Sequence, residues 1–171
     1  MPNLAYLSLG SNILPEKNLP AAVRALTGFG KVLAVSNVWE TPPVGCVDQP
    51  NFLNAAVLLE TPEPPETFHA RVIRPLEHRL DRVRTENPNA PRTIDLDLSL
   101  FNDQILSLGH HHIPDPDILT RAFVAIPLAE IAPTYRHPET GQSLAEIAAT
   151  FTAEKATMHQ RAEVQLAWKR G

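Results

Sequence analysis

The clearest chemical feature of this sequence is a pair of aspartates, Asp95 and Asp97, inside the segment TIDLDLSLF at 93–101. Its alternation of apolar and polar residues predicts a β-strand with both carboxylates on one face. The other face then carries Ile94, Leu96, Leu98 and Leu100. Two carboxylates this close repel each other, and an oxygen-bound divalent cation, Mg²⁺ or Mn²⁺, would relieve the repulsion. The alternative is a strand with one wet face, on which the acids are simply hydrated.

Arginines accompany this predicted strand. Arg92 directly precedes it, and Arg82 and Arg84 flank the loop that leads into it. A planar guanidinium donates two hydrogen bonds at once to phosphate oxygens, so arginines beside a metal-binding acid pair indicate phosphoryl transfer. The arginines upstream are interpreted instead as salt-bridge partners of nearby acids on an exposed helix. This second group pairs Arg71, Arg74 and Arg79 with Glu77, Asp81 and Glu86.

Other candidate sites give weaker signals. Phe52 and Phe123 each follow a loop that contains proline, where a flat heterocycle could stack between two rings, although a lone phenylalanine is ordinarily a core residue. The turn at 10–12 (Gly-Ser-Asn) could offer backbone N–H groups to an anion, but no P-loop or dinucleotide fingerprint is present. The histidines at 110–112 are expected to be solvated, and Cys46 is expected to be inert.

Length and composition favour one globular domain. The chain has 171 residues, of which 43% are hydrophobic and 20% charged, enough apolar material for one core. No apolar run approaches the roughly 18 residues of a membrane span, and no export signal is evident. A single cysteine is typical of a reducing compartment, so we expect a cytoplasmic protein. A net charge of -4 disfavours general binding to nucleic acid.

The pattern of hydrophobic residues predicts an α+β fold. Strands are expected at 4–9, 32–39, 52–61 and 93–101, and helices from about 19 to 26 and after the prolines at 64–65. The second helix has the apolar stripe Phe68, Val72, Leu76 and Leu80, and Pro75 should kink it. The order βαββαβ indicates a ferredoxin-like antiparallel sheet with helices on one face. The remaining segments must cover the other face: a short strand at 104–106, an apolar run at 123–131 and a helix at 143–151.

In several segments the chain resembles the 6-hydroxymethyl-7,8-dihydropterin pyrophosphokinase family, which transfers pyrophosphate from ATP to a pterin alcohol in folate biosynthesis. The motifs that carry the resemblance are LSLGSN at 7–12, TPPVG at 41–45, DQPNFLNAAV at 48–57, LEHRLDRVR at 76–84, APRTIDLDL at 90–98 and RAFVAIPLAEIAP at 121–133. PRTIDLDL is the most diagnostic. The resemblance implies a pyrophosphokinase domain at 1–151, followed by a tail at 152–171.

For the phosphate side, the resemblance implies that Asp95 and Asp97 bind two Mg²⁺ ions on the triphosphate of the co-substrate ATP. Arg82 and Arg84 would lie on a mobile loop that closes over ATP. The other residues of the nucleotide site would be Arg92, Arg121, Glu77 and Leu98, the two arginines holding phosphate oxygens. Arg82, Arg92 and the two aspartates would be the catalytic residues, acting by alignment and charge neutralisation.

For the pterin side, the resemblance implies that Phe52 and Phe123 sandwich the ring and that Asn54 hydrogen-bonds its edge. Thr41, Pro42 and Val44 would line the pocket. The hydroxymethyl oxygen would attack the β-phosphorus directly and release AMP, with no covalent enzyme intermediate. The implied partners are these small molecules alone, with no nucleic acid and no membrane, and the protein is expected to be a monomer.

The chain also departs from the family pattern. Asp81 stands where the family usually has a glycine, Asp115 where it has a histidine that contacts ATP phosphate, and His110 where some members have arginine. An acid beside phosphate requires a compensating cation. These departures motivate a second hypothesis, a non-catalytic pterin or nucleotide binder on the same scaffold. A third, an RNA-recognition module with the same element order, is disfavoured because the strands lack a basic, aromatic-rich RNP motif.

Overall fold

A computed structural model describes residues 2–45, 48–82 and 90–166 of the chain. Arg84, Glu86 and Cys46 lie outside these ranges. The strands are β1 Asn3–Ser11, β2 Lys31–Val35, β3 Trp39–Thr41, β4 Phe52–Thr61, β5 Asp95–Phe101, β6 Leu106–Leu108, β7 His111–Ile113 and β8 His159–Gln160. The helices are α1 Pro15–Leu26, α2 Pro65–Phe68, η1 His69–Ile73, α3 Arg74–Arg79, η2 Pro116–Leu119, α4 Ala122–Ile131, α5 Leu144–Ala149 and α6 Thr152–Lys155.

The central sheet has the order β5-β1-β4-β3-β8, and β2 also pairs with β4. All of these pairings are antiparallel, which confirms the predicted α+β fold with a ferredoxin-like sheet. The middle strand β1 runs between β4 and β5, and its register brings Gly10 opposite both Asn54 and Asp95. The aspartate strand and the predicted pterin strand are therefore fixed on either side of one glycine.

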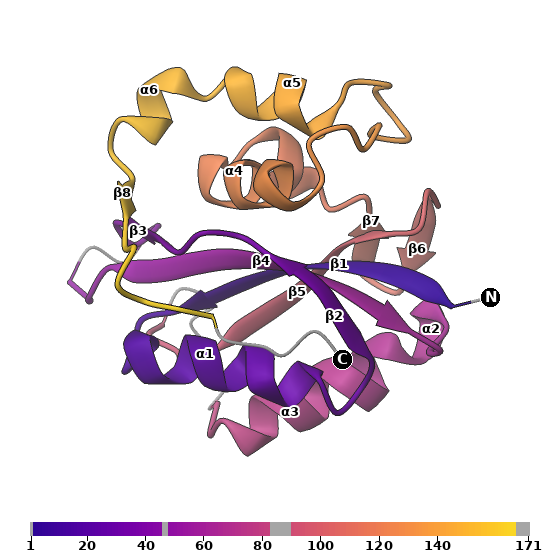
Figure 1. Cartoon of the computed structure of the whole chain (residues 1–171), viewed down its shortest axis with the longest axis horizontal. Coiled ribbons are helices and arrows are strands. Elements are labelled where there is room, and N and C mark those ends of the chain that lie inside the picture. Colours follow the sequence, from indigo (N-terminus) through magenta and orange to yellow (C-terminus); the bar gives the residue numbers. More distant parts are fainter. Residues whose placement is uncertain (1, 46–47, 83–89, 167–171) are drawn as a thin grey trace.

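Helices cover both faces of the sheet, so the molecule has three layers (Figure 1). Helices α1 and α3 lie on one face, where residues such as Leu7, Leu19 and Leu76 form the larger core. Helices α4 and α5 lie on the opposite face and bury residues such as Leu128 and Ile147. The second half of the chain thus covers the face left open by the βαββαβ unit, as the sequence predicts. No helix in the described ranges is long and apolar enough to cross a bilayer.

The strand predicted at 32–39 is instead two strands, β2 and β3, which both pair with β4. Between them the chain leaves the ladder at Ser36, whose hydroxyl accepts a hydrogen bond from the N–H of Ala56 at 2.8 Å. A register shift between Val32 and Ala34 adds further irregularity. The sequence is rich in valine on both sides of this break. The hydrophobic pattern therefore predicts one continuous strand and does not reveal where β2 ends and β3 begins.

A β-bulge in β5 overturns part of the predicted alternation. Leu98 pairs with Leu7 and Leu100 with Tyr6, so Ser99 is an extra residue in the ladder. Beyond the bulge the faces exchange. Leu100 packs in the α4 core rather than with Leu96 and Leu98, and Phe101 takes its place in the α1 core. The period-two prediction holds for both aspartates and fails for Leu100.

Pro75 lies at the start of α3, after a wide π-helical turn at His69–Ile73. In that turn the N–H of Arg74 donates to the carbonyl of His69. Proline has no N–H to donate, and the wide turn accommodates it without an unmade bond. Farther along, the short strand expected at 104–106 lies instead at Leu106–Leu108, paired with β7. The helix predicted at 143–151 is confirmed as α5, with Ser143 accepting from the N–H of Glu146 as its N-cap.

Candidate active site

A pocket of about 220 Å³ opens where the ends of β1, β4 and β5 meet the loop after β3 and the first turn of α4. Residues predicted from the sequence for both substrates line it together: Thr41, Pro42, Val44, Phe52, Asn54, Arg92, Asp95, Asp97, Arg121 and Phe123. Ser8, Leu9, Gly10, Asp117 and Val124 complete its wall. Residues from four distant parts of the chain therefore share one cavity. Glu77, Arg82 and Leu98 do not line this pocket.

Asp95 and Asp97 lie side by side in β5, opposite Gly10 and Ser8 of β1. Burial raises the pKa of Asp97 to about 8, and the neighbouring charges of Asp95 and Asp115 reinforce the effect. Deprotonation of this carboxyl is therefore costly unless a cation is present. Oxygen donors with this need suit Mg²⁺ or Mn²⁺. Within 2–45, 48–82 and 90–166 no three His, Cys, Asp or Glu side chains gather into a complete metal site, so the remaining ligands would be phosphate oxygens and water.

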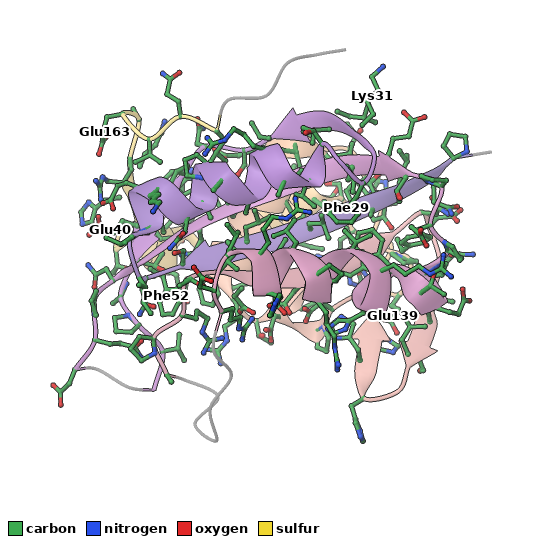
Figure 2. The ribbon with its side chains drawn as sticks, turned by 90° about the horizontal axis from the view of Figure 1, so that it is seen from below. Phe29, Lys31, Glu40, Phe52, Glu139 and Glu163 are labelled. Atoms are coloured by element: carbon green, nitrogen blue, oxygen red, sulfur yellow. The ribbon has the colours of Figure 1, made fainter. Side chains whose placement is uncertain are left out.

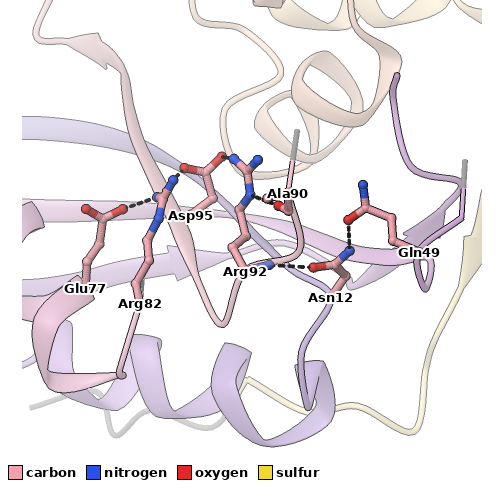
Figure 3. A network of polar contacts seen from close by, with 7 residues as sticks. All are labelled: Asn12, Gln49, Glu77, Arg82, Ala90, Arg92 and Asp95. Atoms are coloured by element: carbon pink, nitrogen blue, oxygen red, sulfur yellow. Dashed lines mark hydrogen bonds and ion pairs between the residues drawn. The ribbon is translucent and has the colours of Figure 1, made fainter. Parts of the chain in front are cut away.

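Arg82 lies between two carboxylates (Figure 3). Its Nη1 donates to Asp95 Oδ1 at 2.8 Å and also to Glu77 Oε2. All but 9% of the Arg82 side chain is buried, and its Nε has no hydrogen-bond partner in the part of the chain that the structure describes. Arg82 thus compensates the charge of Asp95, and Glu77 holds it there.

Arg92 joins the acid pair to an aromatic ring. Its Nη1 lies 3.3 Å from Asp95 Oδ2, and its guanidinium lies over the ring of Phe52, 5.8 Å from the centroid. Its Nε donates to the carbonyl of Ala90 at 3.2 Å. This places a guanidinium, a group suited to phosphate, at the border between the charged and aromatic parts of the pocket.

Asn12 is a structural determinant of the site that the sequence analysis missed (Figure 3). This amide is 2% exposed; its Oδ1 accepts from the N–H of Arg92 at 2.8 Å, and its Nδ2 donates to Gln49 Oε1 at 2.6 Å and to the carbonyl of Pro50 at 3.1 Å. The backbone N–H groups of Asn12 and Ile13 also donate to the carbonyl of Arg92. The LSLGSN motif was the available signal, and in the structure its Asn12 connects two loops.

The aromatic part of the pocket has a polar edge. Asn54 Nδ2 donates to Thr41 Oγ1 at 2.7 Å, and both side chains are buried. Phe52 begins β4 and Phe123 lies in the first turn of α4, so the two rings come from different layers of the fold. A Cβ at Gly10 would lie 3.3 Å from Asn54 Oδ1, closer than ordinary contact. Gly10 therefore leaves room for the side chain of Asn54.

A second pocket, of about 690 Å³, lies on the other side of Asp97. Its wall includes Leu98, the residue implied for the nucleotide site, together with Arg74 and the histidines at 110 and 111. His111 Nε2 is held 3.1 Å from the carbonyl of Leu98. Because Asp97 lines both pockets, the two cavities flank the acid pair.

Two of the three departures from the family pattern, Asp81 and Asp115, have local structural consequences. Asp81 adopts a left-handed conformation with φ 59°, a region in which glycine is unstrained and aspartate is tolerated. Asp115 is buried and caps the helix η2, its Oδ1 accepting from the N–H of Asp117 at 2.9 Å. Burial raises the pKa of Asp115, although that hydrogen bond lowers it. Asp115 thus contributes negative charge close to Asp97.

Together the fold and these pockets define a phosphate-transferring enzyme class, and comparison with known proteins identifies the family. The family model for 7,8-dihydro-6-hydroxymethylpterin-pyrophosphokinase matches residues 6–133. The chain belongs to this family.

Relatives in several organisms support the assignment. The 2-amino-4-hydroxy-6-hydroxymethyldihydropteridine pyrophosphokinase of Pseudomonas aeruginosa is 36% identical over 152 residues, which cover 87% of this chain and 92% of the relative. The enzyme of the same name in Bacillus subtilis is 41% identical over 134 residues, covering 77% and 79%. A crystal structure of Plasmodium falciparum HPPK-DHPS with pterin and p-hydroxybenzoate superposes with a TM-score of 0.73 over 94% of this chain at 15% identity. This chain spans only 45% of that longer protein, and the likeness concerns the fold.

Proposed function

We propose that this chain transfers pyrophosphate from ATP to 6-hydroxymethyl-7,8-dihydropterin, with the pterin in the Phe52–Phe123 pocket and the nucleotide in the pocket beside Leu98. The activity is that of the family, an ATP-dependent diphosphokinase reaction of folate biosynthesis, and its substrates are small molecules. The observation that carries the placement is that Asp97 lines both pockets. A triphosphate extending from one pocket past Asp97 would bring its β-phosphorus to the alcohol in the other.

Asp95 and Asp97 would hold Mg²⁺, and we propose two ions. Bound there, the metal would neutralise phosphate charge and fix the geometry of the triphosphate. The raised pKa of Asp97 supports this assignment, because it shows a carboxyl whose negative charge lacks compensation. With a cation bound at Asp95 and Asp97, Arg82 would no longer be needed to compensate the charge of Asp95 and would be available to the phosphates.

The arginines would hold the triphosphate from two sides. Arg92 and Arg121 both line the pterin pocket and would contact phosphate oxygens next to the reacting alcohol. Arg82 and Arg84 would close over ATP, and Glu77 would keep Arg82 in place until then. Each contributes a fixed positive charge where negative charge moves during transfer.

The pterin would lie flat between Phe52 and Phe123. Offset stacking on two rings suits a planar bicyclic heterocycle, and Asn54, held by Thr41, would hydrogen-bond its polar edge. Pro42 and Val44 would close the open side; 41% of Val44 is exposed, so its apolar surface is available to a ligand.

In this arrangement the hydroxymethyl oxygen attacks the β-phosphorus in line. A new oxygen–phosphorus bond forms, and the bond from the β-phosphorus to the oxygen shared with the α-phosphorus breaks. AMP leaves with that oxygen, and the hydroxyl proton of the alcohol is released to water. Positioning and charge neutralisation supply the catalysis, and no covalent enzyme intermediate is needed. We also propose that the protein is active as a monomer, with residues 1–151 as the catalytic domain. The cytoplasm remains the expected location.

The test is to incubate the protein with Mg²⁺, ATP and 6-hydroxymethyl-7,8-dihydropterin and to separate the nucleotide products. AMP and the pterin pyrophosphate are expected in equal amounts; ADP, or no product, would reject the proposal. The acidic residues Asp81 and Asp115 favour a second candidate, a pterin binder without catalysis. Calorimetry that shows tight pterin binding while no AMP forms would select it.

A further inference from the structure

The last described segment of the chain crosses the edge of the sheet (Figure 1). Met158 packs in the core beneath α4 and α5, β8 pairs with β3, and Val164 and Leu166 pack in the core on the α1 face. Residues 158–166, here named the C-terminal strap, therefore connect the two outer layers of the fold across β3. Such a segment can fix the position of the strand that it crosses.

Arg161 is the polar centre of the C-terminal strap. Its backbone N–H donates to the carbonyl of Val38 at 2.8 Å, which continues the pairing with β3. Its side chain then reaches two elements: Nη1 lies 2.5 Å from Glu40 Oε1 in β3, and Nη2 lies 3.4 Å from Glu16 Oε1 in α1. Its Nε also pairs with Glu163. One guanidinium therefore joins the edge strand to the helix layer.

Glu40 relays this contact to the predicted pterin pocket. Its second oxygen, Oε2, accepts from Asn51 Nδ2 at 3.0 Å, and Asn51 directly precedes Phe52. Thr41, which follows Glu40, pairs in register with Phe52. The loop at 42–51 thus begins and ends beside one carboxylate. Figure 2 shows Glu40 and Phe52 at the same end of the sheet, with Glu163 of the strap on that side.

Strand β3 is short, and apart from its strand neighbours it is held mainly by Trp39, which is buried in the α4 core and donates from Nε1 to Glu130 Oε1 at 3.1 Å. It consists of only three residues, Trp39–Thr41, and has β4 on one side and β8 on the other. A strand this short contributes few ladder hydrogen bonds of its own. The C-terminal strap supplies the second half of its pairing and the charge that holds Glu40.

We infer that the C-terminal strap sets the width of the pterin slot and that Arg161 is a positioning residue for the pterin, acting through Glu40. This inference rests on the proposed placement of the pterin at Phe52 and Phe123. When Arg161 is absent, Asn51 and the start of β4 gain freedom, and pterin binding has to order them. The nucleotide pocket is unaffected, because none of its lining residues belongs to the strap or contacts Arg161.

The test is to measure steady-state kinetics for Arg161→Ala with each substrate varied in turn. We expect the KM for the pterin to rise about tenfold, the scale of a positioning contact, while kcat and the KM for ATP stay within about twofold. Arg161→Lys, which keeps one charge near Glu40, should recover part of the loss. An unchanged pterin KM, or equal increases in the pterin and ATP KM values, would overturn the inference.

A double-mutant cycle separates positioning from general stability. The double variant with Arg161→Ala and Glu40→Gln should raise the pterin KM by no more than the larger of the two single substitutions does. Additive increases would contradict the inference that Arg161 acts through Glu40. Arg136→Gln removes a distant exposed ion pair with Glu146 and is the matched control, expected to leave both KM values unchanged. If Phe52→Ala leaves the pterin KM unchanged, the site assignment itself fails. If Phe52→Ala raises the pterin KM but the Arg161 variants leave it unchanged, the site assignment is supported and the inference about the strap fails.

Discussion

Replacing Asn12 tests whether one buried amide holds the two halves of the active site together. Asn12→Ala removes the acceptor of the Arg92 N–H and the donor to Gln49 and Pro50. The stranded Arg92 N–H costs about 1–3 kcal/mol, and the two lost donor bonds, whose partners can reach water, cost about 0.5–1 kcal/mol each. We therefore expect the free energy of unfolding to fall by about 2–5 kcal/mol.

The catalytic effect should follow from the same contacts. Because the lost bonds position both Arg92 and the loop that ends at Pro50, kcat/KM should fall for ATP and for the pterin together, by about tenfold or more. Asn12→Asp is the matched variant. It keeps the acceptor for the Arg92 N–H and loses both donor bonds. We therefore expect it to retain more of the parent kcat/KM for ATP than of the parent kcat/KM for the pterin.

Urea unfolding and steady-state kinetics on the three proteins decide the matter. A stability change below about 0.5 kcal/mol in Asn12→Ala, together with unchanged kcat/KM for both substrates, would refute the claim that Asn12 couples the two loops. A loss confined to one substrate would show that Asn12 supports a single loop.

Three other predictions follow from the site. In Asp97→Asn, turnover with Mg²⁺ and both substrates should be lost, and the metal-free variant should gain stability relative to the metal-free parent as pH rises from about 4 to about 8. The pKa of Asp97 is about 8 in the folded protein and about 4 in the unfolded chain, so the parent loses stability as pH rises through that window. Urea unfolding at both ends of the window would show no difference in trend between the two proteins if the carboxyl were already compensated. Asp115→Asn keeps the cap on η2 and removes a negative charge beside Asp97, so the KM for ATP should fall several-fold. A higher KM for ATP would show instead that the Asp115 carboxylate contributes to ATP binding. Gly10→Ala should weaken pterin binding about tenfold by displacing Asn54, with little change in ATP binding. Fluorescence titrations with the pterin and with ATP check this, and equal losses of affinity for the two ligands would show a general effect instead.

The sequence by itself determined the local elements and the acid pair. Alternation in 93–101 places Asp95 and Asp97 on one face, and both do line one pocket. Helical patterns likewise predicted α1 and α5. These features depend on residues a few positions apart, whose geometry the backbone fixes without reference to the rest of the chain.

Only the tertiary structure decided how these elements meet. The bulge at Ser99 exists because β5 must match β1 in register, and it sends Leu100 to the opposite core. The contacts Arg82–Glu77, Asn12–Arg92 and Arg161–Glu40 join residues that are 5, 80 and 121 positions apart. Local pattern cannot specify such partners, because a hydrogen bond or ion pair carries no periodic signal in sequence and forms only after the layers have packed.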